Sequence, residues 1–188
     1  SEKARKGFDP LPSGFIRVPY NDLAAVERAA AADPRVRAVW LEVLQGEGGI
    51  QVADLDYVRG LRRLCDERGW LLMIDEVQSG IGRTGKWFAY QWADIRPDVI
   101  TLAKGLGSGV PIGALLAGGR AAGVFGPGQH GTTFGGGPLA MRAGLETLAI
   151  IESEGLMANA VAQGERIRSG LARELAGVSG VKDIRGMG

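Results

Sequence analysis

Apolar runs of strand length alternate along the chain with stretches in which apolar residues recur at helical spacing. The run from Trp70 to Ile74 is almost wholly apolar, which is typical of a strand buried on both faces. Around Val58, by contrast, apolar residues lie three or four positions apart, as on one face of a helix. The pattern predicts strands over residues 36–44, 70–74, 98–103 and 112–117, and helices over residues 22–32, 54–69, 139–152 and 157–175.

The order of these elements indicates the fold class. Strands alternate with helices, so we expect an α/β fold with a mostly parallel sheet flanked by helices. In open sheets of this class, ligands bind outside the carboxyl ends of the strands. Asp75 and Lys104 each come directly after an apolar run, so both are predicted to lie at that edge of the sheet.

The composition excludes several kinds of function. The 188 residues carry a formal net charge of +1 and no basic stretch interleaved with aromatic residues, which argues against a nucleic-acid partner. No apolar run is long enough to span a bilayer, so we expect no membrane partner. The single cysteine, Cys65, excludes an internal disulfide and a cysteine-rich zinc site, and it fits a cytoplasmic location. The single histidine, His130, excludes a catalytic triad and a histidine-based metal site.

Lys104 is the first candidate for chemistry. It follows an apolar run and precedes Gly105 and Gly107, so we expect it to be held in a partly desolvated place. Desolvation lowers the pKa of an amine and makes it a better nucleophile toward an aldehyde. The alternative, on this residue alone, is a surface lysine that begins a loop.

Asp75 is the second candidate, on the strand predicted to neighbour that of Lys104. A carboxylate that faces the ring nitrogen of a pyridine-type cofactor keeps this nitrogen protonated, as an electron sink requires. Neighbouring strands lie about 5 Å apart, so such a ring could bridge Asp75 and Lys104. Gln78 is then placed to donate a hydrogen bond to a ring hydroxyl, and Val77 to pack on the ring face. The alternative for Asp75 is a helix cap or an ordinary carboxylate at a strand end.

A phosphate-binding loop of the ATPase type is a rival explanation for this region. Four apolar residues before Asp75 and Glu76 resemble the second motif of such ATPases, and residues 80–86 spell G-x-x-x-x-G-K. The signature requires Ser or Thr next, whereas Trp87 follows. It also requires a strand before the first glycine and a helix after the lysine, so we interpret the match as a coincidence.

Two glycine-rich segments supply further candidates. Thr132 and Thr133 lie among glycines at 128–137, and hydroxyls and backbone amides in such loops can hold a phosphate. Glu42 and Glu47 lie at and just beyond the end of the first predicted strand, where Glu47 could face the site. A solvated loop glutamate is the alternative for Glu47.

Four motifs, in this order, resemble one family closely. They are Q-G-E-G-G at 45–49, L-L-M-I-D-E-V-Q-S-G-I-G-R-T-G at 71–85, T-L-A-K-G-L-G at 101–107 and H-G-T-T-F-G-G at 130–136. Together they resemble the class III (subgroup II, ornithine-type) aminotransferases over the whole chain. V-P-Y-N-D at 18–22 and D-I-R-G-M-G at 183–188 point to the branch of this family that acts on N-acetylornithine.

The resemblance implies a transferase of fold type I that uses pyridoxal 5'-phosphate (PLP) and builds its active site across a homodimer. By matching position, Lys104 would bind the cofactor covalently, Asp75 would pair with the ring nitrogen, and Gln78 would contact the ring hydroxyl. Thr133 would reach the cofactor phosphate of the partner subunit. Glu47 would act as the substrate-gating glutamate, and Glu42 would also belong to the substrate gate.

The resemblance also implies a reaction and a place for this chain within a longer enzyme. The expected substrates are N-acetylornithine and 2-oxoglutarate, with an aldehyde and glutamate as products in arginine biosynthesis. Another ω-aminotransferase, acting on ornithine, succinylornithine or 4-aminobutyrate, an aminomutase and a non-catalytic fragment are the alternatives. Family members are about twice as long, so we expect residues 1–154 to be part of the PLP-binding large domain and residues 155–188 to begin a small domain. We expect the isolated chain to be inactive.

Overall fold

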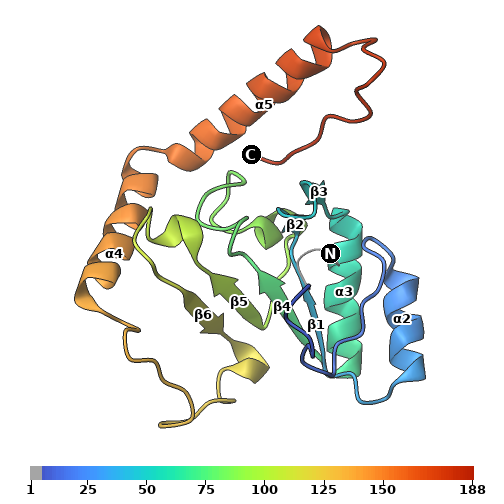
Figure 1. The fold of residues 1–188 in the computed structure, drawn as a ribbon, viewed down its shortest axis with the longest axis vertical. Coiled ribbons are helices and arrows are strands. Elements are labelled where there is room, and N and C mark those ends of the chain that lie inside the picture. Colours follow the sequence, from blue (N-terminus) through green and yellow to red (C-terminus); the bar gives the residue numbers. More distant parts are fainter. Residues whose placement is uncertain (1–5) are drawn as a thin grey trace.

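A four-stranded sheet forms the centre of the molecule in the computed structural model, which describes residues 6–188 (Figure 1). The strands, in spatial order, are β1 (Ala38–Leu41), β4 (Leu71–Asp75), β5 (Val99–Leu102) and β6 (Ala114–Ala117). β4 pairs in parallel with β1 and with β5, whereas β6 pairs antiparallel with β5. The predicted α/β class with a mostly parallel sheet is therefore confirmed.

The predicted strand over 36–44 is wrong at both ends, since β1 begins at Ala38 and the chain leaves the sheet after Leu41. The Tyr20 hydroxyl donates hydrogen bonds to the carbonyls of Glu42 (2.7 Å) and Val43 (3.1 Å), and the Ala53 amide also donates to Val43 (2.8 Å). These bonds turn the backbone away from β4. It continues into a small antiparallel hairpin of β2 (Leu44–Gln45) and β3 (Gln51–Val52).

Two capped helices, α2 (Leu23–Ala32) and α3 (Leu55–Arg68), lie beside β1, as Figure 1 shows. The side chain of Asp22 accepts a hydrogen bond from the Ala25 amide (2.8 Å), and the side chain of Asp54 accepts one from the Asp56 amide (2.8 Å). Gly69 ends α3 in the left-handed conformation, at φ +68°, which favours glycine. The two predicted helices are confirmed.

The core lies between α3 and one face of the sheet. Leu72 and Ile74 of β4 are fully buried there. On the opposite face Trp40 is 54% exposed, and its neighbour is the ring of Phe15, at 6.4 Å between centroids. Leu71 and Met73, on this face of β4, are half-buried. The prediction that residues 70–74 are buried on both faces therefore holds fully for one face only within residues 6–188, since an irregular segment and not a helix lies on the other.

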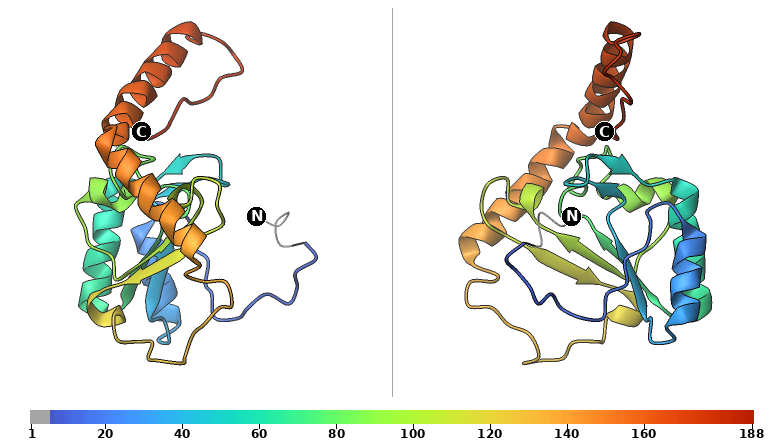
Figure 2. Two further views of the ribbon diagram at one scale, coloured as in Figure 1. Left: turned by 90° about the vertical axis from the view of Figure 1, so that its left-hand side faces the viewer. Right: turned by 45° about the vertical axis from the view of Figure 1, so that its right-hand side comes forward.

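The C-terminal part consists of α4 (Pro138–Ser153) and α5 (Leu156–Glu174), joined by a bend at Gly155 (Figure 2). Both predicted helices are confirmed. α5 buries none of its residues and projects away from the sheet, and the segment after it turns back toward the strands. In the part of the chain from residue 6 onward, no helix combines the length and the apolar character needed to cross a membrane.

Candidate active site

Lys104 lies at the carboxyl end of β5, where a short 3-10 helix, η2 (Lys104–Leu106), begins. Its backbone has φ +41°, and its Nζ donates a hydrogen bond to Oε1 of Gln78 (2.5 Å). The residue is exposed, so the prediction of a partly desolvated lysine is wrong for the described chain. The reason is that η2 carries the backbone beyond the sheet edge, where residues 6–188 leave the side chain open to solvent.

Asp75 is the last residue of β4 and the register partner of Thr101 on β5. Its Oδ1 accepts a hydrogen bond from the Val77 amide (2.9 Å), which fixes the carboxylate at the strand end. Thr101 lies on the same face of the sheet, and its Oγ1 is buried without a hydrogen-bond partner among residues 6–188. The edge thus combines a carboxylate with a buried hydroxyl that is free to bond a further group.

Glu76, which the motifs alone did not assign to a role, organises the loop that carries Val77 and Gln78. It is 1% exposed, and its carboxylate accepts hydrogen bonds from the Ser79 hydroxyl (2.6 Å) and from the amides of Ala89 (3.1 Å) and Tyr90 (3.0 Å). Burial raises the pKa of Glu76, and the three donors oppose this shift. The bonds tie the end of β4 to η1 (Ala89–Ala93). An acid directly after an apolar strand was the signal available in the sequence.

The β2–β3 hairpin brings a third segment to this edge. Gly46 lies against the Gln78 side chain so closely that a Cβ at this position would overlap the Gln78 amide. Oε2 of Glu42 accepts a hydrogen bond from the Gly46 amide (3.1 Å), which explains how a half-buried glutamate supports the hairpin. Glu47 is next in the chain and exposed at the hairpin tip. The structure therefore brings Glu42, Gly46, Gln78 and Lys104 together.

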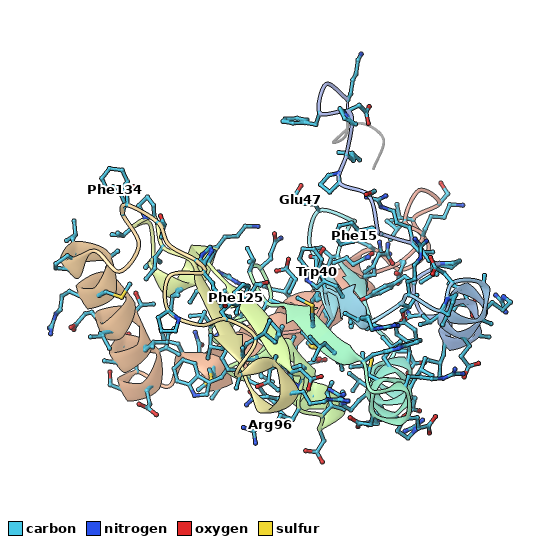
Figure 3. All side chains as sticks on the ribbon, turned by 90° about the horizontal axis from the view of Figure 1, so that it is seen from below. Phe15, Trp40, Glu47, Arg96, Phe125 and Phe134 are labelled. Atoms are coloured by element: carbon cyan, nitrogen blue, oxygen red, sulfur yellow. The ribbon has the colours of Figure 1, made fainter. Side chains whose placement is uncertain are left out.

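Thr132 and Thr133 are not brought to Lys104 of the same chain. Both are exposed in the long loop before α4, and this loop lies at the opposite end of the sheet from η2 (Figure 1). Figure 3 shows Phe134, which belongs to this loop, well apart from Glu47. The described residues therefore do not bring these two threonines to a site at Lys104.

The ATPase-type loop and a metal centre have no support at this edge. Residues 80–86 form turns, and the element after Lys86 is the five-residue η1 rather than an α-helix, so the ATPase-type loop is absent. Within residues 6–188 no cluster of three or more His, Cys, Asp or Glu side chains could hold a metal ion.

The arrangement has a definite chemical capacity. A primary amine, a fixed carboxylate and a carboxamide meet at the carboxyl ends of two parallel strands. The exposed amine of Lys104 can attack a carbonyl carbon and can also carry a proton. The carboxylate of Asp75 can stabilise a cationic ring nitrogen placed above the sheet edge.

Comparison with known proteins identifies the family. The family model described as aminotransferase class-III matches residues 1–188. Acetylornithine aminotransferase 1 of Bordetella bronchiseptica is 69% identical over 188 residues, and acetylornithine aminotransferase of Nitrosomonas europaea is 57% identical over 188 residues. In both cases the match covers 100% of this chain and 48% of the relative, so the chain spans about half the length of the curated relatives it matches.

Solved structures agree with this match. A structure of ornithine aminotransferase from Toxoplasma gondii, with partial occupancy of PLP at its active site, superposes with a TM-score of 0.94 at 37% identity. The match covers 100% of this chain and 44% of the Toxoplasma gondii chain. The fold, the order of the motifs and the match over the whole sequence lead to one conclusion: this chain belongs to the class-III aminotransferase family.

Proposed function

We propose that the protein carrying this chain transfers an amino group from an ω-amino donor, with N-acetylornithine favoured, to 2-oxoglutarate, giving an aldehyde and glutamate. The observation that carries the proposal is the contact of Lys104 with Gln78 beside the fixed carboxylate of Asp75. The names of the relatives at 57% and 69% identity support N-acetylornithine as the donor and arginine biosynthesis as the pathway.

PLP is the cofactor that these residues fit. Lys104 has an exposed amine for covalent attachment, and Asp75 lies at the neighbouring strand end with Oδ1 already oriented by Val77. The buried Thr101 Oγ1 has no partner among residues 6–188, which leaves a donor free beside Asp75. When bound, PLP would act as an electron sink for the carbon that loses a proton.

Each residue at the edge then has a distinct task. Asp75 would hold a proton on the ring nitrogen, and Val77 would pack against the ring face. Gln78, whose Oε1 accepts from Lys104, has its amide NH₂ to donate to the ring hydroxyl. Once an amine donor has displaced it, Lys104 would move the proton at its Nζ between substrate and cofactor carbons as a general acid–base.

The proposal extends to partners and to the organisation of the complete protein. Thr133, and Thr132 beside it, would contact the cofactor phosphate of a partner subunit in a homodimer, in keeping with their distance from Lys104 of the same chain. Residues 1–154 would belong to the PLP-binding large domain, and residues 155–188 would begin a small domain. The cytoplasm is the expected compartment. The chain alone is expected to bind PLP weakly and to lack measurable transaminase activity.

An assay of glutamate formation by the complete protein tests this function. With PLP and 2-oxoglutarate present, N-acetylornithine should give the highest kcat/KM among N-acetylornithine, ornithine, succinylornithine and 4-aminobutyrate. A preference for ornithine, which the similarity to the Toxoplasma gondii enzyme makes the second candidate, would correct the donor but not the reaction class. PLP absorbance without glutamate formation from any donor would contradict a transaminase and favour an aminomutase or a non-catalytic protein.

A further inference from the structure

The segment after α5, residues 175–188, returns to the β2–β3 hairpin and forms hydrogen bonds with the hairpin tip, residues 46–50. Arg185 donates from Nη2 to the carbonyl of Gly49 (2.8 Å) and from Nε to the carbonyl of Ile50 (3.0 Å). Its third contact, from Nη1, is to Asp183 (2.6 Å) on the same segment. Figures 1 and 2 show this C-terminal segment turning back toward the strands from the far end of α5. The guanidinium of Arg185 thus joins the C-terminal segment to two residues that lie 135 and 136 positions earlier in the chain.

The two carbonyls that Arg185 binds belong to residues with a positive φ, of which the second is strained. Gly49 has φ +92° and Ile50 has φ +55°. Glycine adopts the left-handed region freely, but a β-branched residue such as isoleucine rarely does so and is strained there. The planar guanidinium of Arg185 donates to both carbonyls in a fixed geometry. It therefore stabilises this backbone relative to conformations in which Ile50 has a negative φ.

The hairpin tip is connected by direct contacts to Lys104. The amides of Gly49 (3.1 Å) and Ile50 (3.4 Å) both donate to the carbonyl of Gly46. Gly46 in turn lies against the side chain of Gln78, which accepts the hydrogen bond from Lys104. Glu47 lies between the two ends of this connection, so its position depends on the same tip conformation.

We propose that Arg185 is a positioning residue that holds the 46–50 tip in its strained form and thereby sets the place of Glu47 and the packing of Gly46 on Gln78. Arg185 touches neither the reacting amine nor the carboxylate of Asp75, so it acts through the hairpin. The consequence for donor selectivity rests on the function proposed above, whereas the effect on the hairpin does not.

Backbone hydrogen exchange in the complete, PLP-free protein tests the effect on the hairpin. Arg185→Met should speed exchange of the Gly49 and Ile50 amides by about tenfold. This is the increase expected when the hairpin tip loses the stabilisation of about one net hydrogen bond against local opening. Arg185→Lys, which keeps the charge but has a single donor head, should give an intermediate rate. Arg173→Met is the matched control, because Arg173 is also exposed but, within residues 6–188, pairs only with the adjacent Glu174 (2.9 Å). Unchanged exchange at 49–50 in Arg185→Met would overturn the proposal.

Donor selectivity in the PLP-loaded complete protein tests the link to Glu47. Arg185→Met and Glu47→Ala should shift the ratio of kcat/KM for N-acetylornithine and glutamate in the same direction. The double variant should show no larger shift than Glu47→Ala alone, because both changes act on one tip. Additive shifts would overturn the link. If Glu47→Ala itself leaves the ratio unchanged while hydrogen exchange responds to Arg185→Met, the proposed gate fails and the positioning of the hairpin stands.

Discussion

Nζ of Lys104 and Oε1 of Gln78 lie 2.5 Å apart, although 26 positions separate the two residues in the chain. The parallel pairing of β4 with β5 creates this proximity. Asp75 is level with Thr101, so the turn after β4 and the start of η2 leave the same edge of the sheet. A single hydrogen bond thus joins the two motifs that the sequence could only place on neighbouring strands.

Lys104→Ala in the complete protein should abolish the cofactor linkage that borohydride reduces, together with nearly all transamination. An alanine has no amine to bind the aldehyde, and no proton carrier remains at Nζ. Mass spectrometry of the reduced protein locates the linkage. Lys86→Ala is the control, since the amine of Lys86 donates a hydrogen bond to the Gln91 carbonyl (3.0 Å) and lies over the Trp92 ring. A reducible adduct on another lysine in the Lys104 variant would refute the assignment.

Asp75→Asn should leave the fold intact but slow proton abstraction by several orders of magnitude. The amide can still accept the hydrogen bond from Val77 through its oxygen, but it carries no charge to keep a ring nitrogen protonated. Single-turnover absorbance measures this step apart from substrate binding. Asp94→Asn is the matched control, because Asp94 is exposed and asparagine tolerates its left-handed backbone (φ +53°). Turnover at the unmutated rate in Asp75→Asn would place the partner of the ring elsewhere.

The helices and the strand ends of the site could be predicted from the sequence, because caps, apolar spacing and strand-end polar residues are local signals. Asp54, Gly69 and the placement of Asp75 are examples. The hairpin could not be predicted, since the break after Leu41 depends on Tyr20, which lies far away in the sequence.

The exposure of Lys104 and the hydrogen bonds of Arg185 to the hairpin tip could not be predicted from the sequence either. A lysine between a buried strand and glycines looks enclosed when only its neighbours in the chain are considered, but exposure depends on which segments pack above the sheet edge. Arg185 reaches its partners across 135 positions, and nothing in its own motif indicates the hairpin. The family resemblance likewise could not reveal that Gly46 lies against Gln78.

Gly46→Ala should displace the Gln78 side chain from Lys104 and weaken PLP binding in the complete protein. The added Cβ would occupy the space of the Gln78 amide, so one of the two must move. The dissociation constant for PLP, followed by absorbance, should rise by about tenfold, as expected for one displaced hydrogen-bonding group. Gly118→Ala is the control, because a Cβ there would meet no atom within 4 Å. Equal PLP affinity in Gly46→Ala and the control would show that Gln78 does not support the cofactor.

Cys65 should be protected from alkylation in the native protein. The thiol is fully buried, and burial raises its pKa from 9.0 to about 11. Between these two values the unfolded state loses the proton and the folded state keeps it, so the free energy of unfolding falls as pH rises, by up to about 1.4 kcal/mol per pH unit. Denaturant titrations from pH 8 to 11 should show this slope, and Cys65→Ala should show a smaller one, because burial also raises the pKa of Tyr20, Tyr57 and Tyr90. An identical slope in both proteins would assign the pH dependence to other groups.

Glu47 is exposed at the hairpin tip, where it can approach a group that the described residues do not supply. In the reaction proposed above, the donor would present a side-chain amine and glutamate its α-amine, so one site would have to accept two different arms. An arginine that binds the α-carboxylate of glutamate would attract carboxylates strongly unless a glutamate paired with it when the other substrate is bound. We therefore expect Glu47→Ala in the complete protein to shift preference toward α-amino donors.

The shift in the ratio of kcat/KM for N-acetylornithine and glutamate should be about ten- to a hundredfold, since each factor of ten corresponds to about 1.4 kcal/mol of differential binding. Glu47→Gln should give a smaller shift than Glu47→Ala, because it keeps a hydrogen-bond acceptor without the charge. Glu67→Ala is a suitable control, since Glu67 is exposed on α3, away from the hairpin tip. If both kcat/KM values fall by one factor in Glu47→Ala, or neither changes, Glu47 is a solvated loop residue and the gate must be sought in another segment.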